Sequence, residues 1–168
     1  MAFHHTVRNE PRSQRVEGYK GPAGRPHVDV APTYAPTMLR EKFPEEAEKI
    51  MQGRWQMLNL WRPIKTILRD PLAISDATSV PASDQYTLTS PAEQGKLPFQ
   101  MLFTRAGENN MHRWHYLKEQ RPDEPLIFKT FDSDESAKTR MVAHASFVDP
   151  KAEHMPTRES IEVRCIVY

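Results

Sequence analysis

The stretch SIEVRCIVY at residues 160–168 decides the fold class, because it reads as a β-strand with two different faces. Side chains at positions i and i+2 of a strand point to the same side of its sheet. One face therefore carries a row of apolar side chains, at Ile161, Val163, Cys165 and Val167. The opposite face carries Ser160, together with Arg158 just before it. A strand with polar residues inside and apolar residues outside is typical of a double-stranded β-helix.

Short strands with turns between them are predicted for most of the remaining chain. They cover residues 54–61, 64–68, 72–75, 85–89, 99–104, 112–117, 126–131 and 143–148. Fifteen prolines disfavour long helices. One helix is predicted at residues 44–53, where Pro44 suits a first helical position and Gly53 can end the helix. Residues 8–26 are polar and are predicted to be an extended loop. We therefore expect one mainly β domain over residues 1–168, a cupin-like jelly roll with one or few short helices.

Composition narrows the class of protein. Of the 168 residues, 38% are apolar and 27% are charged, with a formal net charge of +1, as in an ordinary soluble domain without a nucleic-acid surface. No apolar run approaches the length of a membrane span, and no signal peptide is evident. Cys165 is the only cysteine, so no internal disulfide can form. We expect a cytoplasmic protein that binds neither membrane nor nucleic acid.

A metal site is predicted from three residues. His27 and Asp29 form an H-x-D pair, whose side chains share one face if the segment is a strand. His144, on the later strand at residues 143–148, can complete a triad of two histidines and one carboxylate, which leaves open positions on iron(II). His112 and His115 are rival candidates for the distal ligand, and His144 can also be a histidine satisfied in the core. No H-E-x-x-H motif supports a zinc hydrolase.

An anion site is predicted just before the last strand. Arg158 can bind a carboxylate at two points through its guanidinium group, and the hydroxyl of Ser160 can add a third hydrogen bond. The carboxylate that fits an iron site of this kind is the far end of 2-oxoglutarate. The alternative is a surface ion pair of Arg158 with Glu159 or Glu162.

Several stretches of the sequence resemble the fungal AsaB-like hydroxylase/desaturase family, which includes gibberellin-desaturase-like and CmcJ-like non-haem iron oxygenases. The resemblance lies in FHHTVR (residues 3–8), HVD (27–29), GRWQMLNLWRPIK (53–65), DPLAISDATSV (70–80), HRWHYL (112–117), DEPLIFKTFDS (123–133), AHASFVDP (143–150) and PTRESIEVR (156–164). In that family a further N-terminal part precedes the first of these stretches, and we expect this chain to lack it.

The resemblance implies an Fe(II)/2-oxoglutarate-dependent oxygenase that uses molecular oxygen to hydroxylate or desaturate a small secondary metabolite. The alternative is a truncated, catalytically silent paralogue that binds a ligand or a partner. Candidate pocket residues are Asn59, Trp61, His112 and Trp114, and for each the competing interpretation is packing in the core. We also predict that the chain either self-associates, most simply as a homodimer, or is poorly stable alone, because the single predicted helix is too short to cover the apolar row of the last strand.

Overall fold

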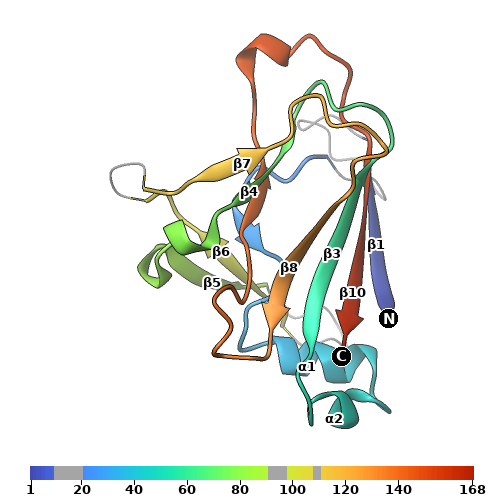
Figure 1. The fold of residues 1–168 in the computed structure, drawn as a ribbon, viewed down its shortest axis with the longest axis vertical. Coiled ribbons are helices and arrows are strands. Elements are labelled where there is room, and N and C mark those ends of the chain that lie inside the picture. Colours follow the sequence, from blue (N-terminus) through green and yellow to red (C-terminus); the bar gives the residue numbers. More distant parts are fainter. Residues whose placement is uncertain (10–20, 91–97, 108–110) are drawn as a thin grey trace.

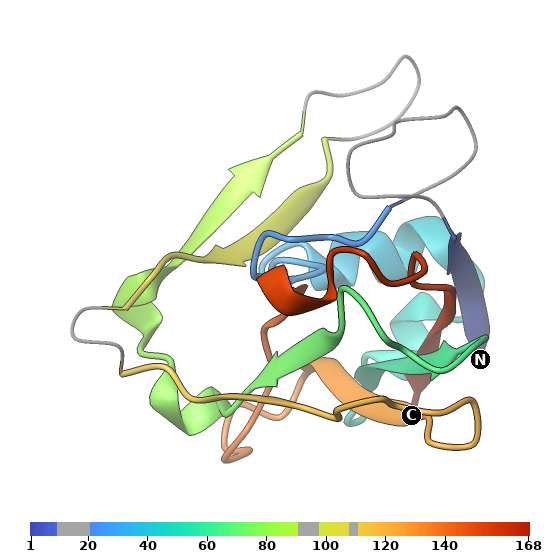
Figure 2. The ribbon, with the colours of Figure 1, turned by 90° about the horizontal axis from the view of Figure 1, so that it is seen from above.

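Two antiparallel β-sheets form the framework of the protein, as expected for a mainly β fold (Figure 1). The structure is a computed structural model that describes residues 1–9, 21–90, 98–107 and 111–168. The four-stranded sheet has the order β1 (Ala2–Arg8), β10 (Ser160–Val167), β3 (Gln56–Pro63) and β8 (Leu126–Asp132). The six-stranded sheet has the order β5 (Gln85–Thr89), β6 (Gln100–Thr104), β2 (His27–Val28), β9 (His144–Ser146), β4 (Leu72–Ser75) and β7 (Trp114–Tyr116). Seen from above, the β5–β6 pair extends away from the four-stranded sheet (Figure 2).

The two sheets bury opposing faces, and polar side chains are part of what they bury. Along β3 the buried residues are Met57, Asn59, Trp61 and Pro63, which alternate with more exposed ones. Along β10 the buried residues are Ser160, Glu162 and Ile166. The apolar row of β10 points to the other side, as predicted, and its members are half-buried or exposed. The inner surfaces of β3 and β10 thus present an amide, a hydroxyl and a carboxylate toward the six-stranded sheet.

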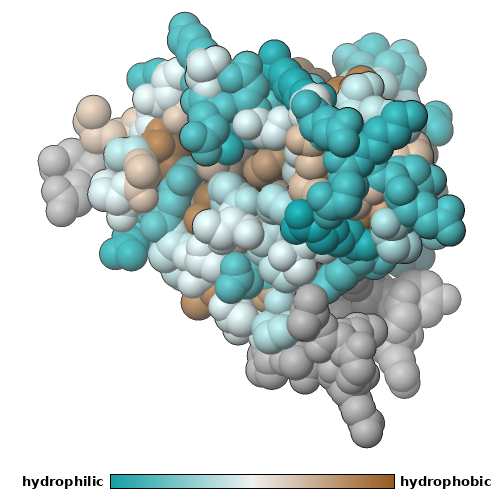
Figure 3. Space-filling view, turned by 90° about the horizontal axis from the view of Figure 1, so that it is seen from below, coloured by the Kyte–Doolittle hydropathy of each residue, from teal (hydrophilic) through white to brown (hydrophobic). Residues whose placement is uncertain are grey.

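Two short helices close one end of the sandwich. Helix α1 (Ala35–Lys42) has proline in its first turn and buries Ala35, Met38 and Leu39, which share a face at helical spacing. Helix α2 (Ala47–Ile50) buries its first and last residues. These side chains join an apolar cluster that also contains Trp55, Phe131 and Ile166. The outer face of this end is mostly hydrophilic, with small separated apolar patches (Figure 3).

The structure corrects the predicted helix. The helix expected at residues 44–53 is limited to the four residues of α2, and α1 was not predicted. The start of α1 was not predicted because residues 32–36 are rich in proline, which disfavours the interior of a helix but is well tolerated in its first turn.

Two strand predictions also need correction. Residues 64–68 form no strand, because the chain leaves the sheet after Pro63, and Ile64 and Leu68 are 43% and 40% exposed. Strand β1, which pairs with β10, was not predicted. Part of the predicted loop at residues 8–26 lies outside the described residues. Three 3-10 turns complete the described elements, at Ala77–Ser79, Ala82–Asp84 and Pro150–Ala152. Within the described residues, no helix is long and apolar enough to cross a membrane.

Candidate active site

Three buried side chains converge between the two sheets. His27 on β2 lies directly opposite His144 on β9 in the antiparallel register, and the two ring centroids are 4.4 Å apart. Asp29 follows β2 immediately. Its Oδ1 lies 3.6 Å from Nε2 of His27, and its Oδ2 lies 3.7 Å from Nε2 of His144. The potential ligand atoms of the three residues all lie within 4.8 Å of one another. Sheet pairing therefore brings together residues that are more than a hundred positions apart in the sequence.

Asp29 is held in a strained backbone conformation by contacts from the opposite sheet. Its φ angle is 22°, which is uncommon for a residue other than glycine and is frequent at functional sites. Asn59 Nδ2 donates a hydrogen bond of 2.6 Å to Oδ2, and a guanidinium nitrogen of Arg164 donates to Oδ1. Asn59 and Arg164 are themselves paired neighbours on β3 and β10. The two donors thus fix the orientation of the carboxylate.

The charges in this cluster follow from burial and from the arginine. Burial raises the pKa of Asp29, but Arg164 and the two histidines outweigh it, so the pKa lies well below its ordinary value. Burial lowers the pKa of His144 to about 3, against the opposing effect of Asp29. Asp29 is therefore a carboxylate and His144 a neutral imidazole at physiological pH.

One hydrogen bond orients the ring of His27. Its Nδ1 lies 2.7 Å from the carbonyl oxygen of Arg25, and a carbonyl can only accept a hydrogen bond. Nδ1 therefore donates this hydrogen bond, and Nε2 is the ring nitrogen that lies near Asp29. This second contact of a histidine ring is the arrangement that orients metal-binding histidines.

A small cavity leads from the two histidines to Arg158. Its lining includes His27, His144, Trp61, Ser146 and Arg158. Arg158 is 3% exposed, and its guanidinium carbon lies 5.5 Å from the centroid of the Trp61 ring. Both Nη1 of Arg158 and the hydroxyl of Ser146 donate to the carbonyl oxygen of Asp70, each at 2.9 Å. The imidazoles of His27 and His144 and the buried guanidinium group of Arg158 thus line one small cavity.

Ser160 is buried at the start of β10, two residues after Arg158. Its hydroxyl has no hydrogen-bond partner within the described part of the chain. A buried polar group without a partner is costly, so a ligand that bonds to it would be favoured.

Of the other predicted site residues, some lie at the site and some lie away from it. Asn59 contacts Asp29, and Trp61 lines the cavity toward Arg158. His112 instead lies 2.7 Å from Asp84 through Nε2, apart from the cluster of His27, Asp29 and His144. Trp114 packs against the apolar cluster around Val28. His115 on β7 is exposed and is likewise not part of the cluster.

Arg164 and Ser146 were not identified from the sequence as site residues. A signal for Arg164 was present, because the alternation that puts Ser160 on the inner face of β10 also puts Glu162 and Arg164 there. The structure shows Arg164 Nε donating to Glu162 at 3.2 Å as well as contacting Asp29. Ser146 shares a face of β9 with His144 by the same alternation.

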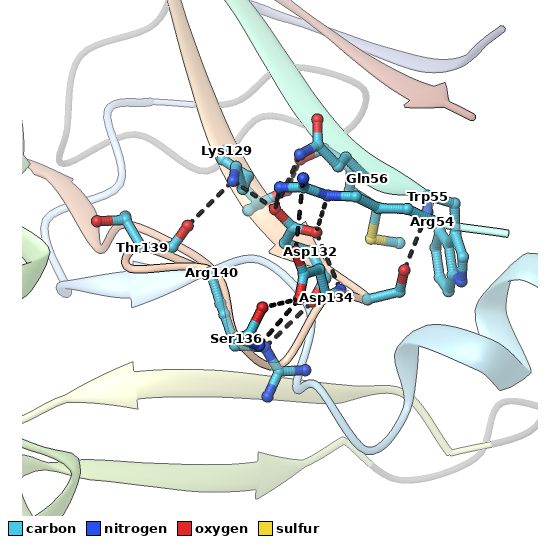
Figure 4. Close-up of polar contacts among 12 residues, drawn as sticks. Arg54, Trp55, Gln56, Lys129, Asp132, Asp134, Ser136, Thr139 and Arg140 are labelled. Carbon is cyan, nitrogen blue, oxygen red and sulfur yellow. Dashed lines mark hydrogen bonds and ion pairs between the residues drawn. The ribbon is translucent and has the colours of Figure 1, made fainter.

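A polar network anchors the loop that delivers His144. Figure 4 shows the side chains of Arg54, Gln56 and Lys129 converging on Asp132, which is fully buried. Lys129 also donates to the carbonyl oxygen of Thr139 at 3.0 Å. The segment between β8 and β9 is therefore tied back to β8 shortly before His144.

Comparisons with known proteins show the family to which this chain belongs. A protein-family model described as "YDMC: Oxidoreductase/YMDC permease-like domain" matches residues 1–168. The alpha-ketoglutarate-dependent dioxygenase phiK of a fungal species is 36% identical over 99% of this chain and 62% of its own length. The hydroxylase/desaturase asaB of Aspergillus flavus is 35% identical over 73% of this chain and 59% of its own length. The chain belongs to the fungal hydroxylase/desaturase family. The gibberellin cluster GA4 desaturase of Gibberella fujikuroi, 30% identical over 95% of this chain and 56% of its own length, is another relative in this family.

A solved structure supports the same family and the jelly-roll fold. The iron and alpha-ketoglutarate-dependent endoperoxidase NvfI superposes with a TM-score of 0.87 and 29% identity, covering 100% of this chain and 61% of that protein. The predicted family and fold class are thus confirmed. The chain spans about 62% of the length of phiK. Among the relatives, phiK is named as an alpha-ketoglutarate-dependent dioxygenase, and nvfI of Aspergillus novofumigatus, 31% identical over 98% of this chain and 60% of its own length, as an Fe(II)/2-oxoglutarate-dependent dioxygenase.

Proposed function

We propose that this protein is an iron(II)- and 2-oxoglutarate-dependent oxygenase that hydroxylates or desaturates a small secondary metabolite. The observation that carries the proposal is the convergence of His27, Asp29 and His144 from separate parts of the chain onto a space 4.8 Å across. Two neutral imidazoles and one carboxylate are the donor set of non-haem iron(II) sites, which keep positions open for co-substrates. The names of the relatives phiK and nvfI point to the same chemistry.

In this proposal His27, Asp29 and His144 would hold iron(II), which with 2-oxoglutarate and molecular oxygen would supply an oxidant able to remove hydrogen from an unactivated C–H bond. Asn59 and Arg164 would orient the carboxylate of Asp29 through their hydrogen bonds. The role of the protein is to orient the substrate and to exclude water.

Arg158 and Ser160 are proposed to bind the distal carboxylate of 2-oxoglutarate. Arg158 is buried and lines the same small cavity as His27 and His144, so its guanidinium group is available to a carboxylate close to the triad. The unpartnered hydroxyl of Ser160 lies two residues away. Trp61 covers the guanidinium and shields the ion pair from water, which strengthens it.

Anaerobic reconstitution with iron(II) and 2-oxoglutarate tests the proposal. We expect a weak visible charge-transfer band in the wild type that is lost in His144→Ala and kept in His112→Ala, the control variant of a histidine outside the triad. Admission of oxygen should then yield succinate. If His112→Ala loses the band and His144→Ala keeps it, the assignment of the distal ligand is wrong. A band without succinate would indicate a ligand-binding jelly roll in place of an enzyme.

A further inference from the structure

A second and larger cavity also reaches the triad. It has a volume of about 470 Å³ and is lined in part by His27 and Asp29. Its remaining lining comes from β1, from the segment before β2, from β6 with the residue before it, and from β10. Its lining differs from that of the cavity beside Arg158, although the two share Arg8, Ala23 and His27. Because it opens onto the same metal ligands, a molecule bound there would lie next to the reacting centre.

The lining of this cavity combines apolar and charged side chains. Its apolar part consists of Phe99, Met101 and Phe103. Three arginines, Arg8, Arg25 and Arg164, also line it. Among the described residues of the lining, Asp29 is the only carboxylate, so these residues carry an excess of positive charge beside an apolar surface.

Two of the three arginines are already engaged by the protein. Arg164 contacts both Asp29 and Glu162. Arg8 donates a hydrogen bond of 2.8 Å to the carbonyl oxygen of Gly21 and is attracted by the charge of Glu162. Arg25 differs, because within the described residues it forms no ion pair with a carboxylate.

Arg25 is nevertheless held in a defined position. Its guanidinium carbon lies 4.8 Å from the centroid of the Phe103 ring, and Nη2 lies 3.4 Å from the hydroxyl of Tyr86. Its carbonyl oxygen accepts the hydrogen bond from Nδ1 of His27. Stacking on an aromatic ring orients the planar guanidinium and leaves its edge free for hydrogen bonds. An anion bound by this edge would therefore sit in a definite place relative to His27.

We propose that Arg25 anchors a carboxylate of an otherwise apolar substrate, whose body lies on Met101 and Phe103 with a C–H bond toward the triad. A carboxylate fits because one planar guanidinium can bind it at two points and neutralise its single charge. The proposal rests on the proposed function for the meaning of the triad, but the anchoring itself requires neither metal nor turnover.

Isothermal titration with two matched probes tests the anchor. The probes are adamantane-1-carboxylate and its methyl ester, which share an apolar body and differ in charge. Saturating 2-oxoglutarate with zinc(II) in place of iron occupies the Arg158 site and prevents reaction. We expect the wild type to bind the acid about tenfold more tightly than the ester, the contribution of one charge-assisted hydrogen-bond pair. Arg25→Gln should remove this preference and leave the affinity for the ester unchanged.

Arg105→Gln is the matched control, because Arg105 also stacks on an aromatic ring, 5.4 Å from the centroid of Tyr86, but does not line the cavity. It should keep the preference for the acid. Equal affinities for acid and ester in the wild type, no binding of either probe, or an Arg25→Gln variant that still prefers the acid would each overturn the proposal. Repeating the titration on metal-free protein separates it from the proposed function. If the iron(II) protein shows no charge-transfer band but the metal-free protein still prefers the acid in an Arg25-dependent way, only the iron chemistry would be refuted.

Discussion

Replacing Arg158 by alanine should weaken the binding of 2-oxoglutarate strongly while leaving iron binding nearly intact. Arg158 is 3% exposed, so a carboxylate bound to it would be shielded from water. Loss of such a buried, charged, two-point contact costs about 2–5 kcal/mol, which corresponds to about a 30-fold to a few thousandfold loss of affinity. Arg158→Lys should recover only part, because an ammonium group is a point charge and cannot bind both oxygens in the same plane.

The structure indicates that this variant should still fold. Arg158 donates to the carbonyl oxygen of Asp70, and because Ser146 donates to the same oxygen, this acceptor keeps a partner after the substitution. Anaerobic titration of the iron(II) protein with 2-oxoglutarate, followed by the charge-transfer band, measures the affinity. Arg62→Ala is the control, because Arg62 is an exposed arginine on the outer face of β3. Equal affinity of wild type and Arg158→Ala for 2-oxoglutarate would refute the assigned role.

Two further predictions concern stability and assembly. Asp132→Asn should lower the free energy of unfolding by about 2 kcal/mol at neutral pH, because it removes the charge on which Arg54 and Lys129 converge. Asp134→Asn is the control and should cost less than about 1 kcal/mol, because the side chain of Asp134 is half-exposed. Hydrogen bonding from Arg54 is the largest cause that lowers the pKa of Asp132 in the folded protein. The stability that the carboxylate contributes is therefore present above the unfolded pKa of about 4 and is lost as the pH falls below that value. In urea unfolding, the difference in stability between wild type and Asp132→Asn should shrink over the same pH range. For the predicted homodimer, light scattering should give twice the chain mass for the wild type and the chain mass for Val163→Glu, since Val163 lies in the outward row of β10; a monomeric wild type would refute the dimer. Because Val163 is only half-buried, we expect this substitution to cost about 1 kcal/mol of folding stability, which urea unfolding would measure.

Local patterns in the sequence determined the fold class and most of the strands. Strands β4 and β5 coincide with the predicted residues 72–75 and 85–89, because alternation and flanking turn residues are local signals. The same alternation predicted which face of β10 is polar. The triad residues and the pair Arg158 and Ser160 were likewise chosen from spacing and residue chemistry.

Other features depended on tertiary contacts that leave no local pattern. Helix α1 begins among prolines and is stabilised by burying Met38 and Leu39 against the end of the sandwich. Strand β1 is defined by its pairing with β10 at the other end of the chain.

The choice among the histidines was also decided by tertiary structure. His27 and His144 meet because β2 and β9 are paired in register, whereas His112 lies against Asp84. The two donors to Asp29, Asn59 and Arg164, come from two neighbouring strands of the opposite sheet. The sequence by itself therefore determined the kinds of residue available for the chemistry, because residue types and periodicity are local. Only the packing of one sheet on the other decided which of them meet, because their distances depend on strand register and on the contact between the sheets.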